Sequence, residues 1–169
     1  AMLSYLSPGL RFFHQGQLEG RTNRIPPHLN RGPVETTNEG LHQFYDRLLG
    51  ILQLPVVRDG RWQLLECAPA WPENWTWDGM VAFAWSGGGE VDRMIVAVNY
   101  SSHQSQCRLR LPFADLTGQR WQLHDLGPLG DGRHERDGNE LAFEGLYVDL
   151  PAWHGHVFQV TKLAYLSCA

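Results

Sequence analysis

One stretch of the chain repeats apolar residues every three or four positions, from Leu41 to Leu52. This spacing predicts an amphipathic helix with one apolar stripe. Thr36 and Glu39 have the spacing of a capping box, in which each side chain satisfies a free backbone N–H at the start of a helix. Pro55 cannot continue a helix, so the helix is expected to end before it. The stripe consists of Leu41, Phe44, Tyr45, Leu48, Leu49 and Leu52.

After Pro55 the pattern changes to short β-type runs separated by turn signals. Residues 80–86 and 94–100 flank a glycine-rich turn and predict a hairpin. Cys107 to Leu111 alternates polar and apolar side chains, as a half-exposed strand does. A shorter strand pair is expected from Val56-Val57 and residues 62–67.

Further strands are expected at 120–124, 140–143, 146–150 and 156–161, with glycine-rich turns between them, notably over 127–138. Many short strands with turns at this spacing predict a mainly β fold, a sandwich or a barrel.

The residues before the helix are less regular. Leu10 to His14 lies between Pro8-Gly9 and Gly16 and predicts a short strand. A polar, proline-rich loop follows over residues 20–35. A loop of this length is usually functional or disordered.

Composition sets limits on the class of protein. The chain has 169 residues, of which 43% are hydrophobic, including seven Trp and seven Phe, so it can fill a core. Its net charge is −4 and it has no basic run, which argues against nucleic-acid binding through phosphate contacts. No stretch approaches the roughly 18 apolar residues of a membrane span, so no membrane partner is expected.

The cysteines and histidines do not predict a metal site. Cys67, Cys107 and Cys168 are odd in number and widely spaced, which favours reduced thiols in a cytoplasmic protein over a zinc site or disulfide framework. His154 and His156 lie two residues apart without a third ligand nearby in the sequence. We therefore expect no metal and no cofactor.

Several segments, in this order, resemble the C-terminal part of family 13 glycoside hydrolases, the α-amylase family. Residues 7–17 (SPGLRFFHQGQ) are similar to the eighth barrel strand of that family, and residues 41–52 to the helix that follows it. The runs at 81–85 (VAFAW), 95–101 (IVAVNYS) and 156–160 (HVFQV) are similar to strands of its C-terminal β-sandwich domain. The resemblance covers nearly the whole chain.

This resemblance implies two parts. Residues 1–55 would be a remnant of the (β/α)₈ barrel, with its last strand, a long loop and its last helix. Residues 56–169 would form the antiparallel C-terminal β-sandwich. In such an enzyme the three catalytic carboxylates come from barrel strands four, five and seven, all before Ser7. The resemblance thus implies no catalytic residue in this chain. It implies a parent enzyme, an α-glucan hydrolase or glucosyltransferase, that binds its substrate through the missing barrel.

The loop after residue 16 would overhang the substrate cleft of that parent. Gln17, Glu19 and Arg21 are then candidates for contact with sugar hydroxyls, since carboxylate and guanidinium groups bind them through paired hydrogen bonds. The simpler interpretation is a set of ordinary solvated loop side chains.

Trp71, Trp75 and Trp77 form the most unusual stretch of the sequence. Their rings could stack on the apolar faces of sugars, which would make the chain an independent carbohydrate-binding module. The alternative, which we favour at this stage, is that they fill a seam between packed layers, because buried aromatic residues are commoner than exposed patches.

The helix stripe suggests a further alternative. If the barrel is absent, one side of the stripe has no partner, and contiguous apolar surface tends to find one. This predicts a protein–protein module or a two-fold homodimer through the helix.

Overall fold

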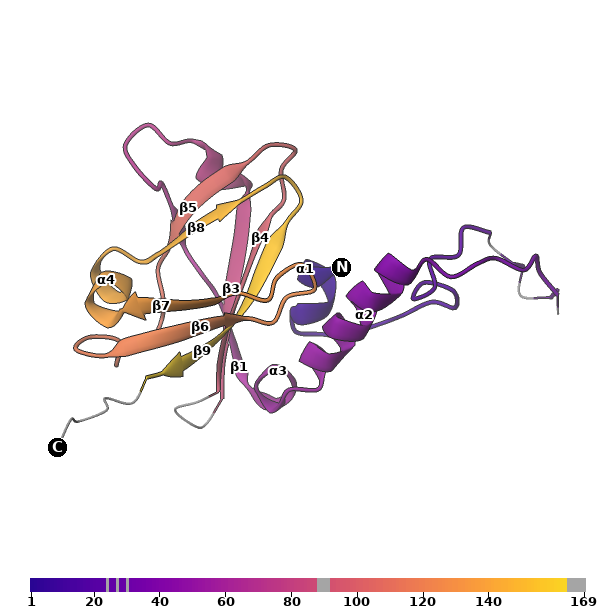
Figure 1. The fold of residues 1–169 in the computed structure, drawn as a ribbon, viewed down its shortest axis with the longest axis horizontal. Coiled ribbons are helices and arrows are strands. Elements are labelled where there is room, and N and C mark those ends of the chain that lie inside the picture. Colours follow the sequence, from indigo (N-terminus) through magenta and orange to yellow (C-terminus); the bar gives the residue numbers. More distant parts are fainter. Residues whose placement is uncertain (24, 27, 30, 88–91, 164–169) are drawn as a thin grey trace.

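The computed structural model describes residues 1–23, 25–26, 28–29, 31–87 and 92–163. These residues form two antiparallel sheets packed face to face, with helices on the outer side of the larger sheet (Figure 1). Among them, six strands make the larger sheet, in the order β1-β3-β4-β9-β6-β7, and three make the smaller, in the order β2-β5-β8. The expected β-sandwich fold is confirmed.

The larger sheet consists of β1 (Arg61–Leu64), β3 (Met80–Ser86), β4 (Arg93–Asn99), β6 (Arg120–Asp125), β7 (Arg133–Asp137) and β9 (Gly155–Lys162). The smaller sheet consists of β2 (Cys67–Ala68), β5 (Ser105–Leu109) and β8 (Leu146–Leu150). The helices are α1 (Met2–Leu6), α2 (Glu39–Leu52), α3 (Pro55–Asp59) and α4 (Gly138–Phe143), with a 3₁₀ turn, η1, at Thr76–Gly79.

The centre of the larger sheet is buried on both faces. Successive side chains of a strand point to opposite faces. Ala82 and Ala84 of β3 therefore contact the core between the two sheets, while Phe83 and Trp85 contact the helices. A strand that is buried on both faces has a continuous run of apolar residues, as β3 and β4 have in the sequence.

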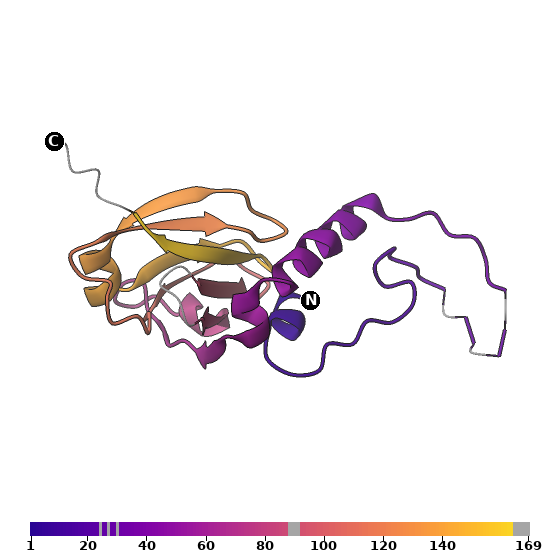
Figure 2. The same ribbon diagram turned by 90° about the horizontal axis from the view of Figure 1, so that it is seen from below.

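Helices α1 and α3 pack on the outer face of this sheet, and α2 packs against both of them and projects away from the sandwich (Figure 2). The inner side of α2 buries Tyr45, Leu48 and Ile51 in one cluster with α1, α3 and the sheet, and Leu48 is completely inaccessible to solvent. The other members of the predicted stripe are half-buried, and none is fully exposed. Much of the stripe that the sequence predicts is therefore covered within the chain, by a cluster that includes residues of α1, α3 and the larger sheet.

The start of the chain differs from the expectation. Residues 10–14 form no strand, because no neighbouring strand is present to pair with them. Helix α1 precedes them instead. The ring of Tyr5 in α1 stacks on Phe13, with ring centroids 4.2 Å apart, and Arg11 donates from Nε to the Tyr5 carbonyl oxygen over 2.7 Å. The apolar residues of this segment thus pack partly on the helical layer.

Helix α2 is confirmed, but its predicted cap is wrong. The capping residue is Asn38, whose Oδ1 accepts the backbone N–H of Leu41 over 3.0 Å, and not Thr36. Asparagine is among the best N-cap residues, because its short side chain reaches back to the first free N–H groups.

Three short elements also differ from the prediction. Val56 and Val57 belong to helix α3, where Pro55 occupies the first turn and starts a helix as well as ending the previous one. Residues 140–143, expected as a strand, lie in α4, which Asp137 caps through the N–H groups of Asn139 and Glu140. Strand β7, with the sequence RHERD, lies at the sheet edge within the stretch expected as turns. Charged side chains suit an edge strand because they discourage pairing with other chains.

Candidate functional site

Gln17 holds the helical layer together. Its Nε2 donates to the hydroxyl of Tyr5 over 2.6 Å and to the hydroxyl of Tyr45 over 2.9 Å. Its Oε1 accepts the backbone N–H of His14 over 3.3 Å. The amide is therefore engaged with α1, α2 and its own loop, and its hydrogen-bonding groups are occupied within the chain.

Glu19 and Arg21 lie in the same tight loop but in different surroundings. Glu19 is half-buried, and its carbonyl oxygen accepts the N–H of Asn38 over 3.0 Å, which ties the loop to the start of α2. Arg21 is exposed and lines an open cavity of about 410 Å³ together with His14 and Asn23. Of the three predicted loop residues, Arg21 is the one that lines this cavity.

The carboxylate of Glu35 links the two ends of the loop over residues 20–35. Glu35 accepts hydrogen bonds from the N–H and the hydroxyl of Thr22, each over 2.9 Å, and from the N–H of Asn23. These hydrogen bonds, that from the Thr22 backbone first, lower the pKa of Glu35. The long loop is thus held at its base.

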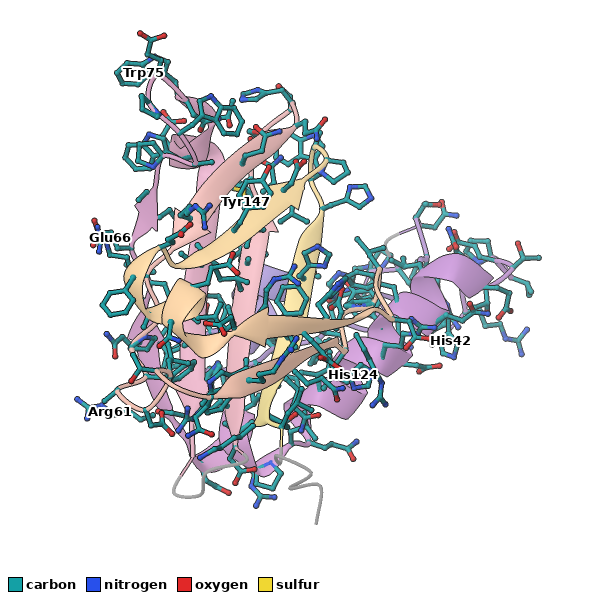
Figure 3. All side chains as sticks on the ribbon, turned by 60° about the vertical axis from the view of Figure 1, so that its left-hand side comes forward. His42, Arg61, Glu66, Trp75, His124 and Tyr147 are labelled. Carbon is teal, nitrogen blue, oxygen red and sulfur yellow. The ribbon has the colours of Figure 1, made fainter. Side chains whose placement is uncertain are left out.

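The tryptophan-rich stretch forms a loop that projects from one end of the sandwich, with Trp75 at its far end (Figure 3). Trp71 is 50% exposed and Trp75 is 78% exposed. Trp77, by contrast, is half-buried and packs against the core between the sheets. The three rings are therefore not presented in a row: one anchors the loop and two point into solvent.

A carboxylate–imidazole pair that the sequence did not reveal joins strands β6 and β9 of the larger sheet. Asp125 at the end of β6 is 3% exposed, and its Oδ2 lies 2.6 Å from Nδ1 of His156 in β9. Its Oδ1 accepts the N–H groups of Gly127 and Val157 over 2.9 and 3.1 Å. Burial raises the pKa of Asp125, but the hydrogen bonds from His156, Gly127 and Val157 outweigh it, so that the pKa is lowered overall.

His156 also lines a cavity of about 190 Å³ between β7 and β8, together with His134, Arg136, Tyr147 and Asp149. A carboxylate can orient an imidazole for proton transfer. However, the described residues that line this cavity include no serine, threonine or cysteine that the pair could activate. The geometry supports a structural role, in which Asp125 fastens the loop after β6 to strand β9.

Neither a metal centre nor a membrane segment is found within the described residues. They contain no cluster of three or more His, Cys, Asp or Glu side chains that could hold a metal ion. His154 and His156 have separate partners, the carbonyl oxygen of Ala152 and the carboxylate of Asp125. Over the same part of the chain, no helix has the length and apolar character needed to cross a bilayer.

No protein-family model and no curated protein matches the chain. Among solved structures, the chain is similar to that of the trehalulose synthase MutB from Pseudomonas mesoacidophila MX-45, with 17% sequence identity and a TM-score of 0.43. The similarity covers 72% of this chain and 18% of that enzyme. At this distance it assigns neither a family nor an activity to the chain.

Proposed function

We propose that this chain is the C-terminal accessory domain of an α-amylase-family glycoside hydrolase or transglycosylase that acts on α-glucans. In this proposal residues 1–55 descend from the end of the barrel and residues 56–169 are the sandwich that braces it. The barrel carries the catalytic carboxylates, and this chain has no turnover by itself.

The observation that carries the proposal is a run of exposed apolar side chains in one segment. The segment between α1 and α2 is held at its base by Glu35 and by the bond between Glu19 and Asn38, yet it extends away from the sandwich (Figure 2). Its apolar side chains are exposed at Leu10 (94%), Phe12 (74%), Ile25 (38%), Leu29 (53%) and Val34 (101%). Exposed apolar side chains gathered in one segment mark a surface that another body covers. The resemblance of residues 7–17 and 41–52 to the end of a barrel supports a barrel as that body.

The groove beside α2 supports the same partner. Leu41 and Phe44 are half-buried and line an open groove of about 440 Å³ with Pro128 and Leu129. Leu129 is 53% exposed. Phe44 and Leu41 lie one and two turns before Leu48 on the same stripe of α2. The stripe is buried at Leu48 and half-buried in the groove, so a barrel docked there would cover the part that this chain leaves accessible.

The test is to read the coding sequence upstream of Met2 and to express the longer protein. We expect at least about 250 further residues, enough for a barrel, with the three carboxylates of the family. Maltooligosaccharides should be turned over by that protein and not by residues 1–169 alone. An upstream sequence without a barrel, or turnover by this chain that survives repurification and the change Glu19→Gln, would contradict the proposal.

A matched pair of variants in the longer protein tests the interface itself. Leu10→Asp with Phe12→Asp should lower its melting temperature, because both side chains would be buried against the barrel. Phe143→Asp is the control, since Phe143 is 78% exposed on α4 and lies outside the proposed contact.

A second candidate function, an independent carbohydrate-binding module, is favoured by the exposure of Trp71 and Trp75. The changes Trp71→Ala and Trp75→Ala test it through binding of the isolated chain to starch. The half-buried position of Trp77 argues against a continuous three-ring platform.

A further inference from the structure

Two exposed aromatic rings far apart in the sequence meet at one end of the sandwich. Tyr100 directly follows β4, and Trp153 lies in the turn between β8 and β9. Their ring centroids are 5.5 Å apart and their planes are nearly perpendicular, at 87°. Tyr100 is 66% exposed and Trp153 is 60% exposed. The pairing leaves much of both rings open to solvent.

A buried amide holds the two turns in place. Asn99 has no exposed surface, and its Nδ2 donates to the carbonyl oxygens of His103, Leu150 and Pro151 over 2.7, 3.0 and 3.0 Å. Its backbone N–H donates to the carbonyl oxygen of His154 over 2.9 Å. One side chain next to Tyr100 therefore fixes the turn that carries Trp153. The rings are positioned before any ligand arrives, which lowers the entropic cost of binding.

The backbone of Trp153 is itself unusual. Its φ is 61°, a left-handed value that is rare for a bulky residue. Among the described residues one other non-glycine residue has a positive φ, Glu73, in the loop that exposes Trp71 and Trp75. Strained residues that the surrounding structure maintains are concentrated at functional sites. Here the strained residue presents a large apolar ring that remains 60% exposed to solvent.

We infer that the Tyr100–Trp153 pair is a binding site for pyranose rings of a neutral oligosaccharide. Aromatic rings stack on the apolar C–H faces of sugars, and the pair offers two such faces. Neither turn, residues 100–104 or 151–154, contains Lys, Arg, Asp or Glu. The carboxylate of Asp149 accepts the Gln104 amide over 2.8 Å, so the turns supply no Lys or Arg side chain for an anionic ligand. The same two turns expose the polar side chains of Ser102, His103 and His154, which can bond sugar hydroxyls.

The size of the pair favours a sugar over a protein partner. A specific protein interface covers about 800 Å² on each side. The exposed parts of two aromatic side chains amount to at most about 300 Å². This area matches one or two sugar rings. The choice of an α-glucan as the probe rests on the proposed function, whereas the ring geometry requires only a pyranose.

The experiment titrates the intact chain with maltoheptaose and follows the indole N–H signals by NMR, with calorimetry for the dissociation constant. We expect the Trp153 signal to move with saturation, while that of the fully buried Trp121 stays in place. Trp153→Asn removes the ring and keeps a residue that accepts a positive φ. It should weaken binding by about tenfold or more. Trp153→Phe should retain part of the affinity, and the control Phe143→Ala should bind as the wild type does.

Two results would overturn the inference. One is that maltoheptaose binds while the Trp153 signal does not move, or that it binds Trp153→Asn with the affinity of the wild type. The other is the absence of binding by maltoheptaose, cellohexaose and chitohexaose alike; a self-association lost in Trp153→Asn would then assign the pair to a protein contact. Binding of a β-linked sugar alone would support the site but contradict the α-glucan proposed above. A missing barrel upstream of Met2 would contradict the proposed function and leave this site untouched.

Discussion

The indole nitrogen of Trp85 donates a hydrogen bond of 2.7 Å to the carbonyl oxygen of Leu6. Trp85 lies in β3 and is 4% exposed, while Leu6 ends helix α1 and is fully buried. The bond fastens the first residues of the chain to the centre of the larger sheet. It also satisfies a carbonyl group that the end of a helix leaves without a partner in the helix.

Trp85→Phe should therefore destabilise the fold. The change removes the donor, leaves the Leu6 carbonyl buried without a partner and opens a small cavity, so we expect a loss of about 1–3 kcal/mol in the free energy of unfolding. Urea denaturation measures it. Trp75→Phe is the control, because Trp75 is 78% exposed and should change stability by no more than about 0.5 kcal/mol. Equal effects of the two changes would contradict the role of the bond.

Leu48→Asp should lower the stability of the chain, whereas Leu10→Asp should not. Leu48 is fully buried between α2 and the sheet, so an unpaired charge there should cost several kcal/mol and lower the melting temperature sharply. Leu10 is 94% exposed, and its change should leave the melting temperature of this chain near that of the wild type.

Sedimentation of the same two variants tests self-association. A homodimer through the helical layer and the preceding segment, as the apolar stripe predicts, should be lost in Leu10→Asp. A dimer that persists in this variant would exclude residue 10 from the contact.

Stability should fall in acid in a way that Asp125 controls. The pKa of Asp125 is lowered in the folded protein, so its ionised form stabilises the fold above the unfolded value of about 3.9. That contribution is lost as the pH falls from there through the folded pKa. Thermal melts from about pH 3 to pH 7 should show a smaller difference between the wild type and Asp125→Asn at the acid end.

Asp59→Asn is the control for this titration. Asp59 is 63% exposed and pairs with its neighbour Arg58. Its removal should therefore change the loss of stability at low pH much less than Asp125→Asn does. An Asp125→Asn variant whose deficit is the same at every pH would contradict the linkage.

Replacing either of two glycines by alanine should have opposite effects on the stability of the protein. A Cβ on Gly138, at the start of α4, would lie 1.8 Å from the carbonyl oxygen of Leu116, a backbone atom that cannot easily move. Gly138→Ala should therefore destabilise the protein. A Cβ on Gly50 in α2 would meet nothing within 4 Å, so Gly50→Ala should stabilise by about 0.5–1 kcal/mol through helix propensity. Chemical denaturation distinguishes the two, and a stabilised Gly138→Ala would show that the start of α4 can shift.

The sequence pattern was sufficient to predict an element where one hydrophobic period extends over many residues. The three-to-four spacing from Leu41 to Leu52 predicted α2, and the apolar runs at 80–86 and 94–100 predicted β3 and β4, because these periods follow from backbone geometry alone. Short elements were harder. Residues 140–143 read as a strand because four residues hardly distinguish the two periods, and the cap at Asp137 decided the outcome.

Contacts between distant residues required the tertiary structure. The sequence by itself determined a mainly β fold with one amphipathic helix and placed Gln17, Glu19 and Arg21 in one loop; the choice of a sandwich over a barrel came from the family resemblance. It did not show that Gln17 would bond Tyr5 and Tyr45, that His156 would meet Asp125, or that Tyr100 would meet Trp153. Such pairs depend on strand order and register, which set the neighbours of a side chain across the sheets and leave no periodic trace along the chain.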